Sequence, residues 1–466
     1  MSRINTNVSS LVAQRVLSKN NDSLNTSLER LSTGLKINSG ADNPAGLIAS
    51  ENLRAEKAGI TQAIDNAGRA SNIIGTAEGG LSEVSNLLTE LQSLVSQSAN
   101  SGGLSKEEKD ANQLQVDSIL NTVNRIAQST SFQGKKLLNG NFDYTTSGVA
   151  STSFDNVRVN AARIPEGQSV NVVVEVTGSA QTGTIGYTGG AIAGGNATIE
   201  IAGNTGTEQL SFASGTAVSS IAAAINSVTT ATGVSAIVSG SDLRITSTGY
   251  GADQFVSVKA VTGTFTTDKA KDAGADAQVT INGSSAQASG KSISYRSSGL
   301  DIEFDLDSTF NKAGTSTFNI TGGGATFALG SKVTEADKAS LGISSVSTAS
   351  LGNNIDGFLS SLASGGANSL TSDNLVNAQK IVDSAIKQVS QLRGRLGAFQ
   401  KFTIGSTVNS LGVALENASA AESAIRDTDF AEETAKLTRA QILSQAATNV
   451  LSQANSAPSA ALSLLR

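Results

Sequence analysis

Both ends of this 466-residue chain repeat apolar residues at the spacing of helices that pack along a seam. Near the start, Leu17, Leu24 and Leu31 recur every seven residues, and Leu28 and Leu35 fill the four-residue steps. A seven-residue apolar repeat keeps one stripe of a helix facing a partner, as in a coiled coil. The pattern therefore predicts a long first helix that needs a partner.

A second helix is predicted from Pro44 to about residue 100, because Asn43 can cap it and proline suits its first position. Its apolar seam recurs every seven residues, at Ile60, Ala67, Ile74, Leu81, Leu88 and Val95. At about 1.5 Å per residue such a helix is about 85 Å long. A helix of this length is not stable alone, so it also needs a partner.

The partner seams lie at the other end of the chain, after a third predicted helix that follows residues 101–103. One seam comprises Ala378, Val382, Ala385, Val389, Leu392, Leu396 and Phe399. Another comprises Leu437, Ala440, Ser444, Ala447, Leu451 and Ala454. Each seam taken singly fits an ordinary intramolecular core, whereas seams at both ends of the chain indicate that the two ends pair with each other.

Between about 142 and 350 the apolar residues alternate with period two, and Gly, Ser and Asn separate the runs, which is typical of strands. We therefore predict an α+β fold: a long antiparallel helical coiled-coil bundle formed by both chain ends, with inserted β-rich outer domains. The predicted boundaries are 1–43 and 427–466 for the arms of an inner helical layer, 44–141 and 351–426 for a helical core, and 142–350 for the variable insertion.

The residue types that most catalytic sites need are missing. The chain has no His and no Cys, which excludes zinc sites built from imidazole or thiolate, cysteine nucleophiles and triads with a histidine base. Carboxylate pairs and Ser-Lys pairs remain possible in principle, but no local grouping of residues suggests one. We therefore expect no enzyme activity, no catalytic residue, no metal and no cofactor.

Charge and hydropathy exclude further partners. The chain has 33 basic and 39 acidic residues, a net charge of −6, so no basic footprint for nucleic acid is present. No run reaches the roughly 18 to 20 apolar residues of a membrane helix, and we expect no membrane partner. The N-terminal residues lack a secretory signal pattern. The sequence therefore predicts a cytoplasmic protein, unless an export route without a cleaved signal takes it out.

Two local features have competing interpretations. Gly79 and Gly80 lie inside the longest predicted helix, where each lowers the stability of the helix by about 1 kcal/mol relative to Ala. They mark either a tolerated bend or the close approach of a neighbouring backbone. Asp427, Asp429 and Glu433 belong to an acidic cluster at a predicted helix start. We interpret these acids as stabilising the helix dipole rather than as paired catalytic carboxylates.

These seams and breaks carry motifs that resemble bacterial flagellin. At the front the matching segments are RLSTGLKIN at 30–38, DNPAGL at 42–47, QSAN at 97–100 and FQGKKLL at 132–138. At the back they are LGA at 396–398, AQIL at 440–443, QAN at 453–455 and LSLLR at 462–466. The middle of the chain is similar to the inserted module of that family around 210–236. The matches cover about 1–140 and 375–466, in the family's order.

The resemblance implies a structural protein that polymerises into the bacterial flagellar filament for swimming motility. It implies an inner tubular layer made by the terminal arms, a second layer made by the next helices, and a solvent-facing insertion. The implied partners are copies of the chain in a helical filament, the flagellar type III export apparatus, an export chaperone, and cap and hook-associated proteins. The implied location is extracellular, on the flagellum, after export without a cleaved signal peptide.

The resemblance also bears on detection by the vertebrate Toll-like receptor five. Recognised family members present an Arg before the QSAN motif and a Glu on the next helix. Here Glu90 and Gln115 stand at the corresponding places, while Leu94 matches. We therefore expect weak receptor activation, and strong signalling by the purified monomer in a reporter assay would refute this expectation.

Two other functions remain open at this point. A hook-filament junction protein shares related ends, and its copy number in isolated filaments would distinguish it. A secreted adhesin displayed on a helical stalk would form discrete oligomers and bind a ligand through residues 142–350. For a chain that polymerises, we expect the arms at about 1–40 and 427–466 to be disordered in the monomer. They fold only when neighbouring copies supply the missing faces.

Overall fold

The structure is a computed structural model that describes residues 6–100, 103–165, 167–297, 299–372 and 375–463, with backbone alone for 458–463. The last three residues of the LSLLR motif therefore lie outside the described residues. The chain divides into two compact units. The arm unit comprises Met1–Gly68, Ala328–Asp337 and Ile404–Arg466, and the body unit comprises Arg69–Phe327 and Lys338–Thr403.

Helices dominate both ends of the chain, and strands fill its middle, as predicted. The α-helices of the described residues are α1 Val8–Thr33, α2 Pro44–Ser98, α3 Lys106–Ser129, α4 Val218–Ser227, α5 Thr229–Thr232, α6 Leu375–Ala398, α7 Gly405–Arg426 and α8 Phe430–Ser463. Short 3-10 helices are η1 Glu335–Asp337 and η2 Leu359–Leu362, and η3 Phe399–Ile404 is a π-helix.

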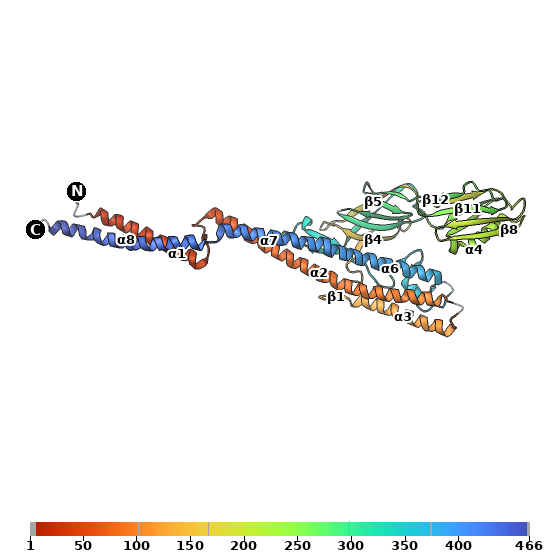
Figure 1. The fold of residues 1–466 in the computed structure, drawn as a ribbon, viewed down its shortest axis with the longest axis horizontal. Helices are drawn as coiled ribbons and strands as arrows, with labels where there is room; N and C mark the ends of the chain where they lie inside the picture. The colour runs from red at the N-terminus through yellow and green to blue at the C-terminus, as the bar shows by residue number, and fades with distance from the viewer. Residues whose placement is uncertain (1–5, 101–102, 166, 298, 373–374, 464–466) are drawn as a thin grey trace. The chain divides into compact units, whose positions relative to one another are not determined.

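In the arm unit, α1 and α8 lie side by side (Figure 1), and both chain ends are at the same end of the pair. Farther along, the first part of α2 is joined to α7 by ion pairs. The Nζ of Lys57 lies 2.8 Å from the carboxylate of Glu422, and Arg426 lies 3.0 Å from Glu51. These contacts run in opposite chain directions, so α2 and α7 are antiparallel.

In the body unit, the rest of α2 runs antiparallel to α6 and is followed by α3. Polar contacts between α2 and α6 link Gln92 to Asp383 and Glu78 to Arg393, and Ser71 of α2 contacts Gln400 of η3. The start of α3 is fixed by a capping box in which Ser105 and Glu108 each accept from the other's backbone N–H. The predicted end of α2, near residue 100, falls at Ser98, and α3 ends at Ser129.

The sequence did not predict η3, which separates α6 from α7. Its wider hydrogen-bonding turn includes Phe399 and Ile404, and π-helical turns inside α-helices occur frequently at functional sites. The α-helical seam spacing ends where η3 begins. The helix after the break, α7, continues to Arg426.

The β-rich middle of the body unit has two separate cores. In the first, a five-stranded and a four-stranded antiparallel sheet share one apolar interior that includes Val174, Phe304 and Phe318. In the second, a four-stranded and a three-stranded sheet enclose Ile199 and Ile245, with helix α4 packed against them. Alternating burial along strand β17 follows the period-two pattern of its sequence.

The strands are given in sheet order. The first core has β14 Ser284–Ser285, β13 Gln278–Ile281, β5 Val170–Gly178, β18 Gly314–Gly323 and β3 Tyr144–Ser147, with β15 Gln287–Ser289, β16 Ser292–Arg296, β17 Leu300–Leu306 and β4 Phe154–Ala162. The second has β12 Lys271–Ala273, β11 Phe255–Thr262, β7 Ala197–Gly203 and β8 Thr207–Phe212, with β6 Thr184–Tyr187, β10 Asp242–Ser247 and β9 Val234–Ser239. Two-stranded pairs are β1 Ser131–Phe132 with β2 Lys135–Lys136, β19 Ala325–Ala328 with β20 Lys338–Leu341, and β21 Gly352–Asn353 with β22 Gly357–Phe358.

Candidate assembly surface

Helices α1 and α8 are held in register by polar contacts spread along their length. Each contact joins a side chain of α1 to one of α8, and each hydrogen bond is 2.7 Å long. In order along α1 the contacts are Ser10 to Asn455, Asn21 to Ser444 and Ser27 to Glu433. Because α1 positions rise while α8 positions fall, the two helices are antiparallel.

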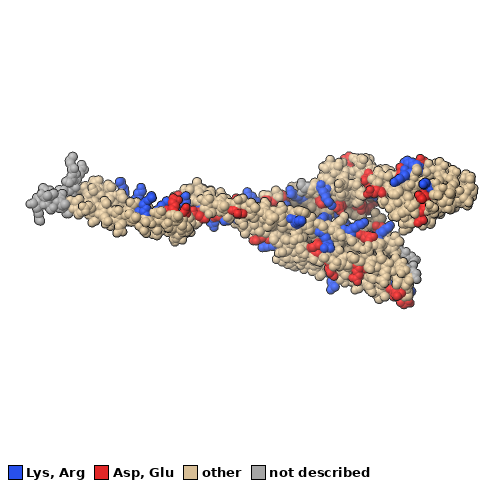
Figure 2. Space-filling view, in the orientation of Figure 1, with Lys and Arg blue, Asp and Glu red and all other residues tan. Residues whose placement is uncertain are grey.

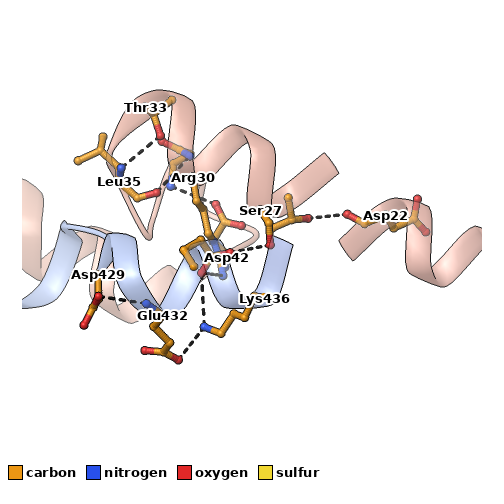
Figure 3. Close-up of polar contacts among 12 residues, drawn as sticks. Asp22, Ser27, Arg30, Thr33, Leu35, Asp42, Asp429, Glu432 and Lys436 are labelled. Atoms are coloured by element: carbon orange, nitrogen blue, oxygen red, sulfur yellow. Dashed lines mark hydrogen bonds and ion pairs between the residues drawn. The ribbon is translucent and has the colours of Figure 1, made fainter. Parts of the chain in front are cut away.

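Charge is concentrated at the inner end of the pair, where Figure 3 shows Arg30, Glu432 and Lys436. Glu433 is buried and accepts from Ser27. The guanidinium of Arg30 lies 4.0 Å from the Glu433 carboxylate, and the ammonium of Lys436 lies 3.4 Å from it. Lys436 also contacts Glu432 at 2.8 Å, and this hydrogen bond raises the pKa of Lys436. The buried carboxylate is thus surrounded by donors, which it requires.

The chain turns between α1 and α2 are built into the same end of the arm unit. Gly34 ends α1 with φ of 72°, a left-handed conformation that suits glycine. Its carbonyl then accepts from the N–H of Thr428, next to the bridge between Leu35 and Asp427. Asp429 accepts from two backbone N–H groups at the start of α8. Of the predicted acidic cluster, Asp429 therefore caps α8, whereas Glu433 contacts α1.

The outer end of the arm pair is apolar and uncharged. No charged residue occurs from Thr6 to Gln14 or from Ala440 to Ser463, and the visible face of this stretch is tan in Figure 2. A groove of about 500 Å³, here named the outer groove, is lined chiefly by apolar and small side chains. Its lining residues are Val8, Ser9, Val12, Ala13, Val16, Asn20, Leu443, Ala446, Ala447 and Val450.

Large apolar side chains of this stretch are exposed within a single chain. Val8 is 59% exposed, Val450 is 58% exposed and Ile442 is 64% exposed. The buried residues of α1 are Ser10, Ala13 and Ser27, and all three are small. The arm pair therefore presents apolar surface that one copy of the chain cannot cover.

The structure separates the predicted seam residues into three groups by burial. The buried ones are Ile60, Ile74, Leu81, Leu88, Val95, Val382, Val389 and Leu396. The half-buried ones are Leu17, Leu24, Leu31, Leu35, Phe399, Leu437 and Leu451. Leu28 is 46% exposed. Burial is thus complete in the predicted seam of α2 and α6 and incomplete in that of α1 and α8.

The predicted receptor-contact residues lie on α2 and α3 of the body unit. Glu90 and Gln115 are exposed, but Leu94 is only 6% exposed. Leu94 belongs to the packed side of α2, next to the buried Val95. A side chain in this position offers little surface to a receptor in the single chain, while Glu90 and Gln115 are accessible.

Several residues of the outer groove were not among the predicted seam residues, namely Val12, Val16, Leu443 and Val450. The seam analysis assigned one apolar stripe to each helix, and these residues lie off that stripe. The signal was nevertheless present in the sequence. Apolar residues on more than one face of an uncharged helical stretch indicate more than one packing partner.

Comparison with known proteins places the chain in a family. Residues 4–143 match the bacterial flagellin N-terminal helical region, residues 379–465 match the bacterial flagellin C-terminal helical region, and residues 198–249 match the flagellin hook IN motif. The first two matches contain both arms of the outer groove. The third falls on the second β core, where the sequence indicated the family's inserted module.

Two full-length relatives support the same family. Flagellin B of Vibrio cholerae is 31% identical over 476 residues, which cover 99% of each chain, and the B-type flagellin of Pseudomonas aeruginosa is 30% identical with the same coverage. The FliC structure from Burkholderia pseudomallei is 17% identical and covers 71% of this chain and 99% of that one, with a TM-score of 0.25. The chain belongs to the bacterial flagellin family. It is a structural subunit of the flagellar filament.

Within the described residues, no helix combines the length and the apolar character needed to cross a membrane. This holds for α8 as well, although it has no charged residue from Ala440 to Ser463. The exposed apolar side chains of the arm pair are interrupted by Ser, Asn and Gln. They therefore suit a protein surface that packs on another protein surface.

Proposed function

We propose that the chain polymerises through its arm pair, with the outer groove and the exposed side chains around it buried against neighbouring copies. The observation that carries the proposal is the uncharged apolar surface shared by α1 and α8. An exposed apolar patch of this kind marks an interaction site. A contact that uses different faces on successive copies generates an open helical assembly, as a filament requires.

The energetics favour folding of the arms together with assembly. Complete burial of a Val, Leu or Ile side chain stabilises by about 1.5 to 3 kcal/mol, and Val8, Ile442 and Val450 leave most of this contribution unused in one chain. Ordering the backbone costs about 1 to 2 kcal/mol per residue. We therefore propose that the arms at about 1–40 and 427–466 are disordered in the free subunit and fold when neighbours cover them.

The buried seam of α2 and α6 has a different role in this proposal. Its members Leu81, Leu88 and Leu396 are fully buried within one chain, so this seam can form before assembly. We propose that it is an antiparallel coiled coil and the stable helical core of the subunit. We propose that the boundaries at 43/44 and 426/427 separate the late-folding arms from this core, and that those at 141/142 and 350/351 separate the core from the β-rich insertion.

The same proposal covers location and partners. The subunit acts outside the cell in swimming motility, after unfolded export through the flagellar type III apparatus without a cleaved signal peptide. An export chaperone, cap proteins and hook-associated proteins are its proposed partners besides copies of itself. The role is structural, without enzyme activity. Weak activation of the Toll-like receptor follows from the exposed Glu90 and Gln115, which replace the residues of recognised relatives.

The test compares two substitutions of equal chemistry. Val450→Asp places a charge beside the outer groove, and Val261→Asp places the same charge on strand β11, where the replaced valine is 46% exposed. Seeded polymerisation of the purified chain, followed by light scattering and electron microscopy, should fail for Val450→Asp and proceed for Val261→Asp. Filaments of normal length from Val450→Asp would contradict the proposed surface.

A further inference from the structure

The body unit contains a cavity that the assembly surface does not use. It has a volume of about 580 Å³ and lies between strands β3, β4 and β17 on one side and helix α6 on the other. We name it the arginine cavity, because Arg158, Arg296 and Arg395 line it. Arg296 is 67% exposed, so the lining reaches solvent. The volume falls within the range of small-molecule sites.

Two guanidinium groups in this lining lack good hydrogen-bond partners in the protein. The Nε of Arg395 is buried and has no hydrogen-bond partner among the described residues. Arg158 donates to the carbonyl of Gly352, and this contact is long at 3.5 Å. Guanidinium groups carry five N–H donors and remain charged in proteins. A buried cation of this kind is costly unless an anion pairs with it.

The carboxylates around the cavity are occupied by other donors. Glu303 pairs with the exposed Arg296 at 3.1 Å, and Asp301 pairs with the same Arg296 at 3.5 Å. Asp305 accepts from Asn156 at 2.9 Å. Asp143 accepts from the backbone N–H of Tyr144. These acids surround the two inner arginines without supplying a direct ion pair to either.

The electrostatics of the two arginines also favour a bound anion. Burial lowers the pKa of Arg395, Glu303 and Asp301 oppose this shift, and the positive charge of Arg158 adds to it. Burial also lowers the pKa of Arg158. Both guanidinium groups remain charged, and burial without a directly paired carboxylate makes these charges costly. An anion between them would offset this cost and satisfy their donors.

We propose that the arginine cavity binds a small organic anion, with its carboxylate or phosphate head on Arg158 and Arg395. Leu351, Phe358 and Leu392 also line the cavity and would contact an apolar body. Planar guanidinium groups pair with carboxylate and phosphate in a bidentate manner, so either head group suits them. The arginine cavity and the outer groove have no lining residue in common.

Calorimetric titration of the full-length monomer tests the proposal, at low and constant ionic strength because salt screens the interaction. The probes are benzoate, phenyl phosphate and inorganic phosphate, with neutral benzyl alcohol as the uncharged comparison. We expect saturable binding of one or both aromatic anions and none of benzyl alcohol. Inorganic phosphate should bind more weakly than phenyl phosphate, because it lacks the apolar body.

Substitutions locate the binding. Arg395→Gln and Arg158→Gln should each weaken it by about tenfold or more, as loss of a charge-assisted pair does. Arg393→Gln is the matched control, because Arg393 lies on the same helix but pairs with Glu78 at 2.7 Å; it should change affinity less than about twofold. Circular dichroism checks folding, and Arg158→Gln carries the test if Arg395→Gln does not fold.

Two results would overturn the proposal. One is the absence of saturable binding of both aromatic anions to the unsubstituted chain. The other is unchanged affinity in a folded Arg158→Gln or Arg395→Gln variant, which would place the anion elsewhere on the chain. Equal binding of phenyl phosphate and inorganic phosphate would support the arginine site while removing the role of the apolar lining.

Discussion

Ser27 donates a 2.7 Å hydrogen bond to the carboxylate of Glu433, which lies 406 positions later in the chain. The bond joins the last third of α1 to the start of α8, and both residues are buried. Arg30 and Lys436 add positive charge to the same carboxylate. The contact fixes the register of the arm pair at its inner end, while the outer groove occupies the other end.

Removing the hydroxyl of Ser27 should weaken the arm pair. In Ser27→Ala the buried Glu433 loses a donor, and an unsatisfied buried polar group costs about 1 to 3 kcal/mol. We expect filaments of this variant to dissociate at a lower temperature than unsubstituted filaments, measured by light scattering during heating. Ser23→Ala is the matched control, because the exposed Ser23 hydroxyl bonds only to the Lys19 carbonyl. Equal dissociation temperatures for the two variants would contradict the role of the contact.

Two adjacent glycines of α2 should respond oppositely to alanine. A Cβ on Gly80 would lie 2.7 Å from the Thr130 hydroxyl and 2.8 Å from a methyl group of the buried Leu138, whereas a Cβ on Gly79 meets nothing within 4 Å. Gly79→Ala should stabilise the body unit by roughly 0.5 to 1 kcal/mol through helix propensity. Gly80→Ala should destabilise it by about 1 to 3 kcal/mol through overpacking.

Urea unfolding of the monomer measures both effects. Of the two interpretations offered for this pair, the structure supports close approach for Gly80 alone, and the approaching atoms belong to side chains rather than to a backbone. A stabilised Gly80→Ala variant would show that Thr130 and Leu138 can move away without cost.

Acid should selectively weaken the second β core through Asp272. Its carboxylate accepts from the backbone N–H of Thr184 and from Lys269, both at 2.9 Å, and these hydrogen bonds lower its pKa. A lowered folded-state pKa gives stability that is present above the ordinary value of about 3.9 and is lost as pH falls through the folded pKa. The expected cost of Asp272→Asn at pH 7 is about 1 kcal/mol.

Urea unfolding at neutral and acidic pH checks this prediction. The difference between Asp272→Asn and the unsubstituted chain should begin to shrink below about pH 3.9, where the unfolded chain takes up the proton. It should vanish below the lowered folded pKa, where the folded carboxylate has lost its charge as well. Lys269→Gln is the control: Lys269 is 54% exposed, so its loss should lower the stability less than Asp272→Asn does. A difference that does not depend on pH would contradict the assignment to the carboxylate.

The buried seams could be predicted from the sequence, because the spacing of apolar residues indicates which face of a helix is buried. Leu81, Leu88 and Val389 lie on single stripes, and each is buried in one chain. The alternating run in β17 likewise indicated a strand with one buried face. Such patterns are local, so they identify an element and its inward face without knowledge of its partner.

The pairing of distant segments could not be predicted from the sequence in this way. Strand β5 pairs with β18, in a register that sets Val174 opposite Ser316, and nothing in either run specifies the other. The π-helical turn η3 was missed for a related reason, since its residues have no spacing of their own. The arginine cavity was missed because Arg158 and Arg395 are distant in sequence and meet only through the tertiary fold.

The most direct test of the central claim is electron microscopy of a chain that lacks both arms, residues 1–40 and 427–466. Under conditions in which the full chain forms open-ended tubes, we expect the truncated chain to remain a soluble core with the circular dichroism of folded helix and sheet. The full chain, examined beside it, is the control. Tubes formed by the truncated chain would contradict the account, because assembly would then not require the arms.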